Sequence, residues 1–265
     1  MATNHKTGAL WHNMVALPVG LSLIGWGFMI WAIVNMASPT VAFMMPMDTA
    51  WSVQEVGAVW LMWAVMMMAM MLPSVLPMIA AHGRLTALRD PKTPDATLWF
   101  LLAYLLVWTL FSLAALGLQW GFQRADVLSF MLKLENPAIN GAIAVVAGAF
   151  QLTQHKAACL QNCRTPMDHL TTNWQAGRRG ALRMGIDHGL HCVACCWALM
   201  MLLFVGGVMD LATIAALTAL VALEKLAPKG PLIAKLAGVA LLVWGALQLL
   251  GAFGVMTPWV FFPWL

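Results

Sequence analysis

Long apolar runs, nearly free of charged residues, recur along the chain and constrain its fold more than any other feature. We identify seven of them, at residues 18–36, 57–80, 97–118, 138–156, 186–208, 211–226 and 232–252. About 20 apolar residues are enough for a helix to cross the hydrocarbon core of a bilayer. Only 9% of the residues are charged, against about 25% in a soluble domain. The sequence therefore predicts an all-α, polytopic membrane helical bundle of about seven transmembrane helices, with residues 1–265 as a single transmembrane domain.

Lysine and arginine are unevenly distributed between the two sets of connecting segments. With the N-terminus inside, the outer loops hold only Arg124 and Lys133. The cytoplasmic segments then hold twelve: Lys6, Arg84, Arg89, Lys92, Lys156, Arg164, Arg178, Arg179, Arg183, Lys225, Lys229 and Lys235. Because cytoplasmic loops are enriched in these residues, we predict a cytoplasmic N-terminus and no nucleic-acid partner. An odd number of spans sends the C-terminus outside, where "TPWVFFPWL" is predicted to be an interfacial anchor.

All five cysteines lie within a short part of the chain. Cys159 and Cys163 follow the fourth apolar run, and Cys192, Cys195 and Cys196 lie near the start of the fifth. The predicted orientation places both groups toward the cytoplasm, where thiols stay reduced. A disulfide framework is therefore not expected. The cysteines are interpreted as soft-metal ligands or as a redox pair.

Helical geometry gathers His188, Cys192, Cys195 and Cys196 within an arc of about 100°. His188 and Cys196 lie about 12 Å apart along the axis, so one helix cannot supply every ligand of one ion. Cys159 and Cys163, four residues apart, are predicted to complete a site with these four residues. The alternative is that each buried cysteine packs as a small hydrophobe.

Methionine is the second source of soft ligands. The second apolar run, "VWLMWAVMMMAMMLPSVLPM", carries Met62, Met66 and Met70 along one stripe, and "MMPMD" precedes it in an outer loop. Thioethers suit Cu(I), so we predict these three methionines as ligands along an inward copper path. Methionine is also a flexible core filler. Because the methionines of this run cover most of the helix circumference, we expect some of them to face lipid.

Two acidic residues near the apolar runs have alternative interpretations. Glu224 is predicted to be an interfacial cap or the ion-pair partner of Lys225, and the alternative is a contact with the metal site. Asp187 is expected to orient His188 or to favour the start of its helix.

Several stretches together resemble a bacterial family of predicted metal-binding integral membrane proteins of uncharacterised function. The similarity covers most of residues 55–250 and rests on "MWAVMMMAMMLPS", "YLLVWTLFS", "CLQNCRTP", "RMGIDHGLHCVACCWALMMLLFVGGVMDL" and "LEKLAPKG". It implies a metal-binding, multi-pass protein of the bacterial inner (cytoplasmic) membrane, and it implies no particular metal or reaction.

The function favoured by these features is handling of copper as Cu(I), by uptake or by delivery to a cuproenzyme. One alternative is a structural or assembly subunit of a larger membrane complex, stapled by zinc or copper. Another is a membrane thiol oxidoreductase that uses Cys192 and Cys195, so the sequence leaves open whether the protein is an enzyme. The expected partners are the lipid bilayer and a membrane complex or cuproenzyme. ATP-driven classes are excluded because no Walker-type loop is present.

Overall fold

The computed structural model describes residues 3–46, 48 and 50–253, and this part of the chain is built from helices without strands. The helices are α1 (Thr3–Val34), α2 (Pro39–Met44), α3 (Val53–Arg89), α4 (Ala96–Arg124), α5 (Pro137–Gln151), α6 (Gln154–Arg164), α7 (Pro166–Thr172), α8 (Gly177–Gly206), α9 (Leu211–Leu226) and α10 (Gly230–Ala252). The all-α prediction is confirmed for these residues. The predicted C-terminal anchor lies outside them.

Five helices are long and apolar enough to cross a membrane. They correspond to the first, second, third, fifth and seventh predicted spans: Val15–Val34, Val53–Arg89, Ala96–Arg124, Gly177–Gly206 and Gly230–Ala252. The predicted fourth and sixth spans fall on the shorter helices α5 and α9. The count of seven spans and the orientation therefore stay predictions.

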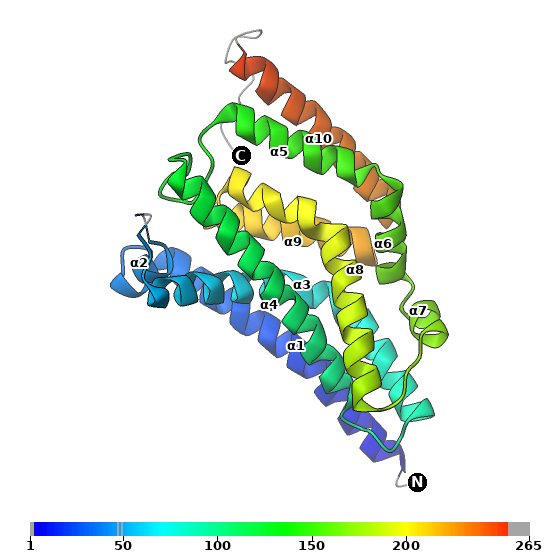
Figure 1. Cartoon of the computed structure of the whole chain (residues 1–265). Coiled ribbons are helices and arrows are strands. Elements are labelled where there is room, and N and C mark those ends of the chain that lie inside the picture. The colour runs from blue at the N-terminus through cyan, green and yellow to red at the C-terminus, as the bar shows by residue number, and fades with distance from the viewer. Residues whose placement is uncertain (1–2, 47, 49, 254–265) are drawn as a thin grey trace.

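The fourth predicted span is interrupted between α5 and α6, which meet at an angle in Figure 1. Thr153 causes the change of direction, because its hydroxyl donates to the Phe150 carbonyl (2.7 Å) and accepts from the Lys156 amide (3.2 Å). A threonine that caps in this way starts a new helix. Cys159 and Cys163 are thus carried by a separate short helix that packs against α8.

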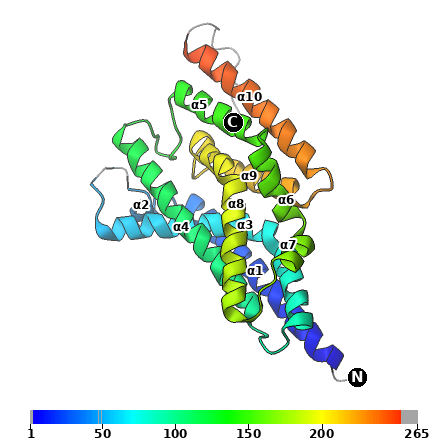
Figure 2. The same ribbon diagram turned by 45° about the vertical axis from the view of Figure 1, so that its right-hand side comes forward.

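Helix α3 lies at the centre of the bundle, in contact with α1, α2, α4, α7 and α9. Its path bends near the middle in Figures 1 and 2, and Pro73 and Pro77 lie inside it. Proline is the usual cause of such a bend, because it removes a backbone hydrogen bond. The bend lets one long helix touch several neighbours.

The methionines of α3 are buried on all sides of the helix. Six are at most 2% exposed: Met62, Met66, Met67, Met70, Met71 and Met78. Met68, of intermediate exposure, still packs against the core. The expectation that some of these methionines face lipid is therefore wrong for these six. The reason is that neighbouring helices, rather than lipid, surround α3.

Helices α4 and α8 approach closely through two glycines of α8. A Cβ atom at Gly185 would lie 2.4 Å from the Phe100 carbonyl oxygen, and one at Gly189 would lie 2.9 Å from Val107. Small residues four positions apart allow helix backbones to pack closely. This contact places the middle of α8, with His188 and Cys192, directly against α4.

Candidate metal centre

Four of the five cysteines gather where α6 meets α8. Cys192, Cys195 and Cys196 are at most 1% exposed, and the sulfurs of Cys195 and Cys196 are 3.2 Å apart. Cys163, on α6, is partly buried and has its thiol within hydrogen-bonding reach of Cys192 and Cys195. We call these four residues the cysteine cluster. Cys159, one turn earlier on α6, packs at the edge of the core and forms no hydrogen bond to another sulfur in the described part of the chain.

Arg164 fixes the position of Cys163 by anchoring the end of α6. Its guanidinium donates to the carbonyls of Glu224 (2.7 Å), Ala227 (2.7 Å) and Pro228 (3.1 Å), at the C-terminal end of α9. Carbonyls at a helix C-terminus lack intrahelical partners and carry partial negative charge, so the half-buried Arg164 guanidinium suits them. The hydrogen bond with Cys192, with burial adding to it, raises the pKa of the Cys163 thiol.

Cys192 is the member of the cluster with the most polar contacts. The Lys225 ammonium of α9 donates to its sulfur at 2.9 Å, and the Tyr104 hydroxyl of α4 is 3.2 Å away. Lys225 also donates to the Ser74 hydroxyl of α3 (3.2 Å). A buried ammonium requires an acceptor, preferably an anionic one. Cys192 is therefore the sulfur best placed to exist as a thiolate, the form that binds metal ions.

A second buried charge network lies beside the cluster. The Lys156 ammonium donates to a Glu224 carboxylate oxygen (2.6 Å) and to the Cys195 carbonyl (2.7 Å), and the Gln151 amide donates to the other Glu224 oxygen. The prediction that Glu224 is an interfacial cap or pairs with Lys225 is wrong. Adjacent residues of a helix point about 100° apart, so Glu224 faces α6 while Lys225 faces Cys192.

These two networks leave one positive charge without a carboxylate. Lys156 and Lys225 carry two charges, and Glu224 compensates only one of them. A Cys192 thiolate would restore neutrality inside the protein.

His188 lies one turn before Cys192 and is 3% exposed. Its ring stacks on those of Tyr104 (centroids 5.8 Å apart) and Phe100 (6.0 Å). Its Nδ1 atom is buried without a hydrogen-bond partner among the described residues. Asp187 does not orient His188 as expected, because its carboxylate points outward and pairs with His169 at 3.2 Å.

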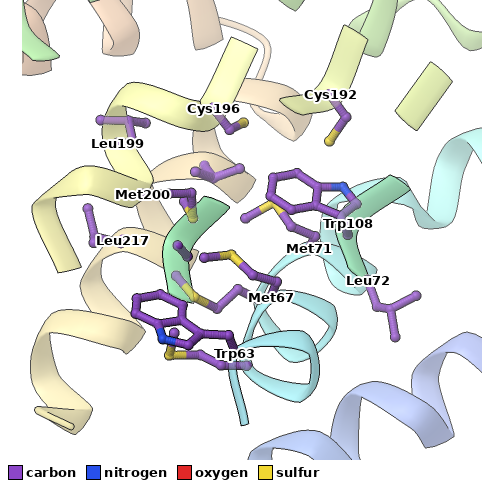
Figure 3. Packing of buried hydrophobic residues seen from close by; sticks show 14 of the residues in the cluster. Trp63, Met67, Met71, Leu72, Trp108, Cys192, Cys196, Leu199, Met200 and Leu217 are labelled. Carbon is purple, nitrogen blue, oxygen red and sulfur yellow. The ribbon is translucent and has the colours of Figure 1, made fainter. Parts of the chain in front are cut away.

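Methionines extend from the cysteine cluster into the core. In Figure 3, Met71, Met67 and Met200 lie between the two labelled cysteines and Trp63, all within one hydrophobic cluster. The predicted ligands belong to the same cluster: Met62, Met66 and Met70. The column seen in Figure 3 thus includes methionines of the other α3 stripe and one from α8. Met47, of the outer group, lies outside the described residues.

Within the described residues, no group of three or more His, Cys, Asp or Glu side chains has the arrangement of a metal site. The thiols instead form hydrogen bonds with one another and with the backbone. For example, the Cys195 thiol donates to the Cys192 carbonyl (3.2 Å). Metal binding would require these thiols to lose protons and turn. The ligand roles predicted for the cysteines, His188 and the methionines therefore stay predictions.

Sequence reasoning missed several polar neighbours of the cluster. Tyr104 is the only tyrosine of the chain, and its place in an apolar run was the available signal. Lys156 and Lys225 were counted only as indicators of orientation. Nothing in their local sequence distinguishes a buried lysine from one at the membrane surface.

Comparison with known proteins identifies the family. No curated protein and no solved structure matches the chain. The model of the PpoB2 family, described as a copper chaperone, matches residues 60–248. This range is more than half of the chain and contains every predicted ligand. The predicted association with copper is confirmed at the level of the family. The chain therefore belongs to the PpoB2 copper chaperone family.

Proposed function

We propose that the protein binds Cu(I) as cargo at the cysteine cluster and delivers it to a cuproenzyme at the bacterial inner membrane. The observation that carries the proposal is the contact of Lys225 with Cys192 inside the core, 2.9 Å long, while Glu224 is already paired with Lys156. The copper chaperone family adds support. The five apolar helices suit a protein embedded in lipid.

Charge and ligand type both favour Cu(I) over zinc. Two thiolates and one Cu(I) ion carry a net charge of minus one, which Lys225 would neutralise. Zn²⁺ with the same two thiolates is neutral, so the Lys225 charge would stay uncompensated in a low-dielectric interior. Thiolates bind both ions, but the thioethers packed near the cluster suit Cu(I) and are not among the usual ligands of zinc, which are Cys, His, Asp and Glu.

The methionines would extend the path of the cargo. Thioethers bind Cu(I) without losing a proton, and Met62, Met66 and Met70 lie in the core cluster that also contains Cys192. With the predicted cytoplasmic N-terminus, these three methionines would lead from the outer side toward the cysteines. Uptake and internal delivery would both use it.

Elemental analysis of the detergent-purified protein tests the proposal. After growth with copper and zinc, we expect about one copper per wild-type chain and a loss of that copper in Cys192→Ser/Cys195→Ser. Cys159→Ser is the matched control, since its thiol lies outside the cluster, and it should keep its copper.

Two other outcomes would overturn the proposal. Stoichiometric zinc without copper would favour a structural staple that joins α6 to α8. Metal-free protein with a reducible disulfide among Cys192, Cys195 and Cys196 would favour thiol redox chemistry.

A further inference from the structure

The cysteine cluster has no direct opening to solvent on α8. Cys192, Cys195 and Cys196 are each at most 1% exposed. A cargo ion that reaches these three sulfurs therefore needs intermediate ligands between them and a surface of the protein, either the partly exposed Cys163 of α6 or other side chains next to α8.

Three histidines form a graded series next to the cluster. The exposed fraction of the side chain falls from 32% at His191 to 12% at His169, and the residue exposure of His188 is 3%. The ring centroid of His169 is 5.8 Å from that of His191 and 6.5 Å from that of His188. His188 is followed one turn later by Cys192. The rings thus lead stepwise from the surface to the buried sulfurs.

A carboxylate lies at the outer end of this series. Asp187 is half-exposed, and its two oxygens lie 3.2 Å from His169 Nε2 and 3.6 Å from His191 Nδ1. A cavity of about 230 Å³, partly open to solvent, is lined by His169, Asp187 and Met184. A small cation can therefore approach imidazole and carboxylate groups from outside.

The unpartnered Nδ1 of His188 is the second observation that points to a ligand. A buried nitrogen without a hydrogen bond is destabilising, and the ring that carries it lies 6.5 Å from the ring of His169 and one turn before Cys192. Stacking on Phe100 and Tyr104 holds the ring in this place. A metal ion in transit would satisfy the nitrogen.

We infer that His191, His169 and His188 form a transfer path for Cu(I) between this surface and the cysteine cluster. The inference rests on the proposed function. Imidazole binds copper, and thiolate is the softer ligand, so affinity for Cu(I) rises from the surface inward. Each step needs only one or two donors, which agrees with the lack of a preformed site of three or more ligands in the described residues.

The transfer is ligand exchange without redox chemistry. Copper stays Cu(I), and each step forms one copper–nitrogen or copper–sulfur bond while another breaks. A thiol that gains copper releases its proton to water, and one that gives up copper takes a proton back.

The rate of copper removal tests this path. Full-length, copper-loaded protein in detergent is mixed with the water-soluble Cu(I) chelator bathocuproine disulfonate, and formation of the coloured complex is followed. His169→Ala and, separately, His191→Ala should keep the wild-type copper content and release it about tenfold more slowly, because loss of one exchange step raises the barrier to transfer. The control is His155→Ala, an exposed histidine of α6 away from the path, which should release copper at the wild-type rate.

Unchanged or faster release in both variants, with full copper content, would overturn the path and leave the cluster itself intact. Faster release would mean that the histidines close the entrance rather than carry the ion. Wild-type protein without copper would overturn the proposed function and this inference together. The two failures are therefore distinguishable.

Discussion

Two regions of this molecule are both apolar and helical, yet they are built on different physical principles. In α3 and α8, 67% and 61% of the residues of the most apolar stretch are buried inside the protein, whereas the figure for α10 is 17%. Three cysteines of the cluster belong to α8. The buried Lys156 and Lys225 contact α8 next to them, and Glu224 pairs with Lys156. Apart from Lys235, the exposed side chains of α10 are apolar, for example Leu236, Val239 and Val243.

The α10 region is held by close backbone packing. It lies along α5 in both views of the fold (Figures 1 and 2). A Cβ atom at Gly148 would lie 2.7 Å from the Gly238 carbonyl oxygen, and one at Gly245 would lie 2.8 Å from that of Gly141. Lipid offers no hydrophobic driving force between helices, so small residues and van der Waals contact hold such pairs together. The comparison teaches that the buried charges and the cysteines are confined to the region whose helices are covered by the rest of the protein.

The largest expected effect is on stability, at the buried ion pair. Glu224→Gln leaves the Lys156 ammonium without its anionic partner, and breaking a buried pair in this way costs about 3–5 kcal/mol. We expect a sharp drop in the thermal unfolding temperature in detergent. Glu55→Gln, at an exposed helix cap, is the control and should change it little. Equal effects of the two changes would contradict the importance of the buried network.

The next effect concerns copper affinity. Lys225→Met removes the cation beside Cys192, and loss of a group that supports a metal ligand weakens binding by about 10–100-fold. Competition with a Cu(I) chelator at equilibrium measures the change. Lys229→Met, an exposed neighbour on the same segment, should bind like the wild type. An unchanged affinity of Lys225→Met for copper would show that the Lys225 charge does not contribute to copper binding.

A substitution between α5 and α10 tests the other region. Gly148→Leu forces the two backbones apart, and overpacking of this kind costs about 1–3 kcal/mol. We expect a lower unfolding temperature with the copper content per folded chain retained, since the cluster lies elsewhere. Gly117→Leu is matched to it, because a side chain there meets no atom within 4 Å. Loss of copper from Gly148→Leu would show that the two regions are coupled.

The smallest effect is expected at a surface contact at the N-terminal end of α8, away from the cysteine cluster and from α10. The Asp95 carboxylate accepts a hydrogen bond from Trp99 Nε1 (2.9 Å) and one from Arg178 Nε (2.8 Å). These hydrogen bonds lower the pKa of the Asp95 carboxyl below its ordinary value of 3.8, and the one from Trp99 has the larger effect. A lowered folded-state pKa gives stability that is present above the unfolded value and is lost as the pH falls through the folded value.

Asp95→Asn should therefore reduce the unfolding temperature slightly at pH 7. The difference from the wild type should vanish below the folded-state pKa, under pH 3.8. Unfolding scans of both proteins across this range measure it. A difference that persists in acid would assign the effect to packing rather than to charge.

Much of the fold follows from local sequence. Five of the seven apolar runs predicted as spans form long helices. The capping pattern of Ser52 and Glu55 starts α3. The helical period also places Cys192, Cys195 and Cys196 near one another on α8. Each of these features depends on residues within a few turns of the same helix.

The surroundings of the site depend on contacts distant in sequence. Tyr104 reaches Cys192 from 88 residues away, and Lys225 reaches Ser74 from 151. Cys163 joins the cluster, while Cys159 does not, because Thr153 redirects the chain and Arg164 anchors the end of α6.

The sequence by itself determined an apolar, helical chain with soft sulfur ligands grouped on one helix, because composition and helical period act locally. Only the tertiary structure decided that α3 is surrounded by protein, that Glu224 pairs with Lys156, and that Lys225 meets Cys192. The physical reason is that periodicity fixes the direction in which a side chain points along its own helix. Which neighbour stands in that direction is set by the packing of all the helices together.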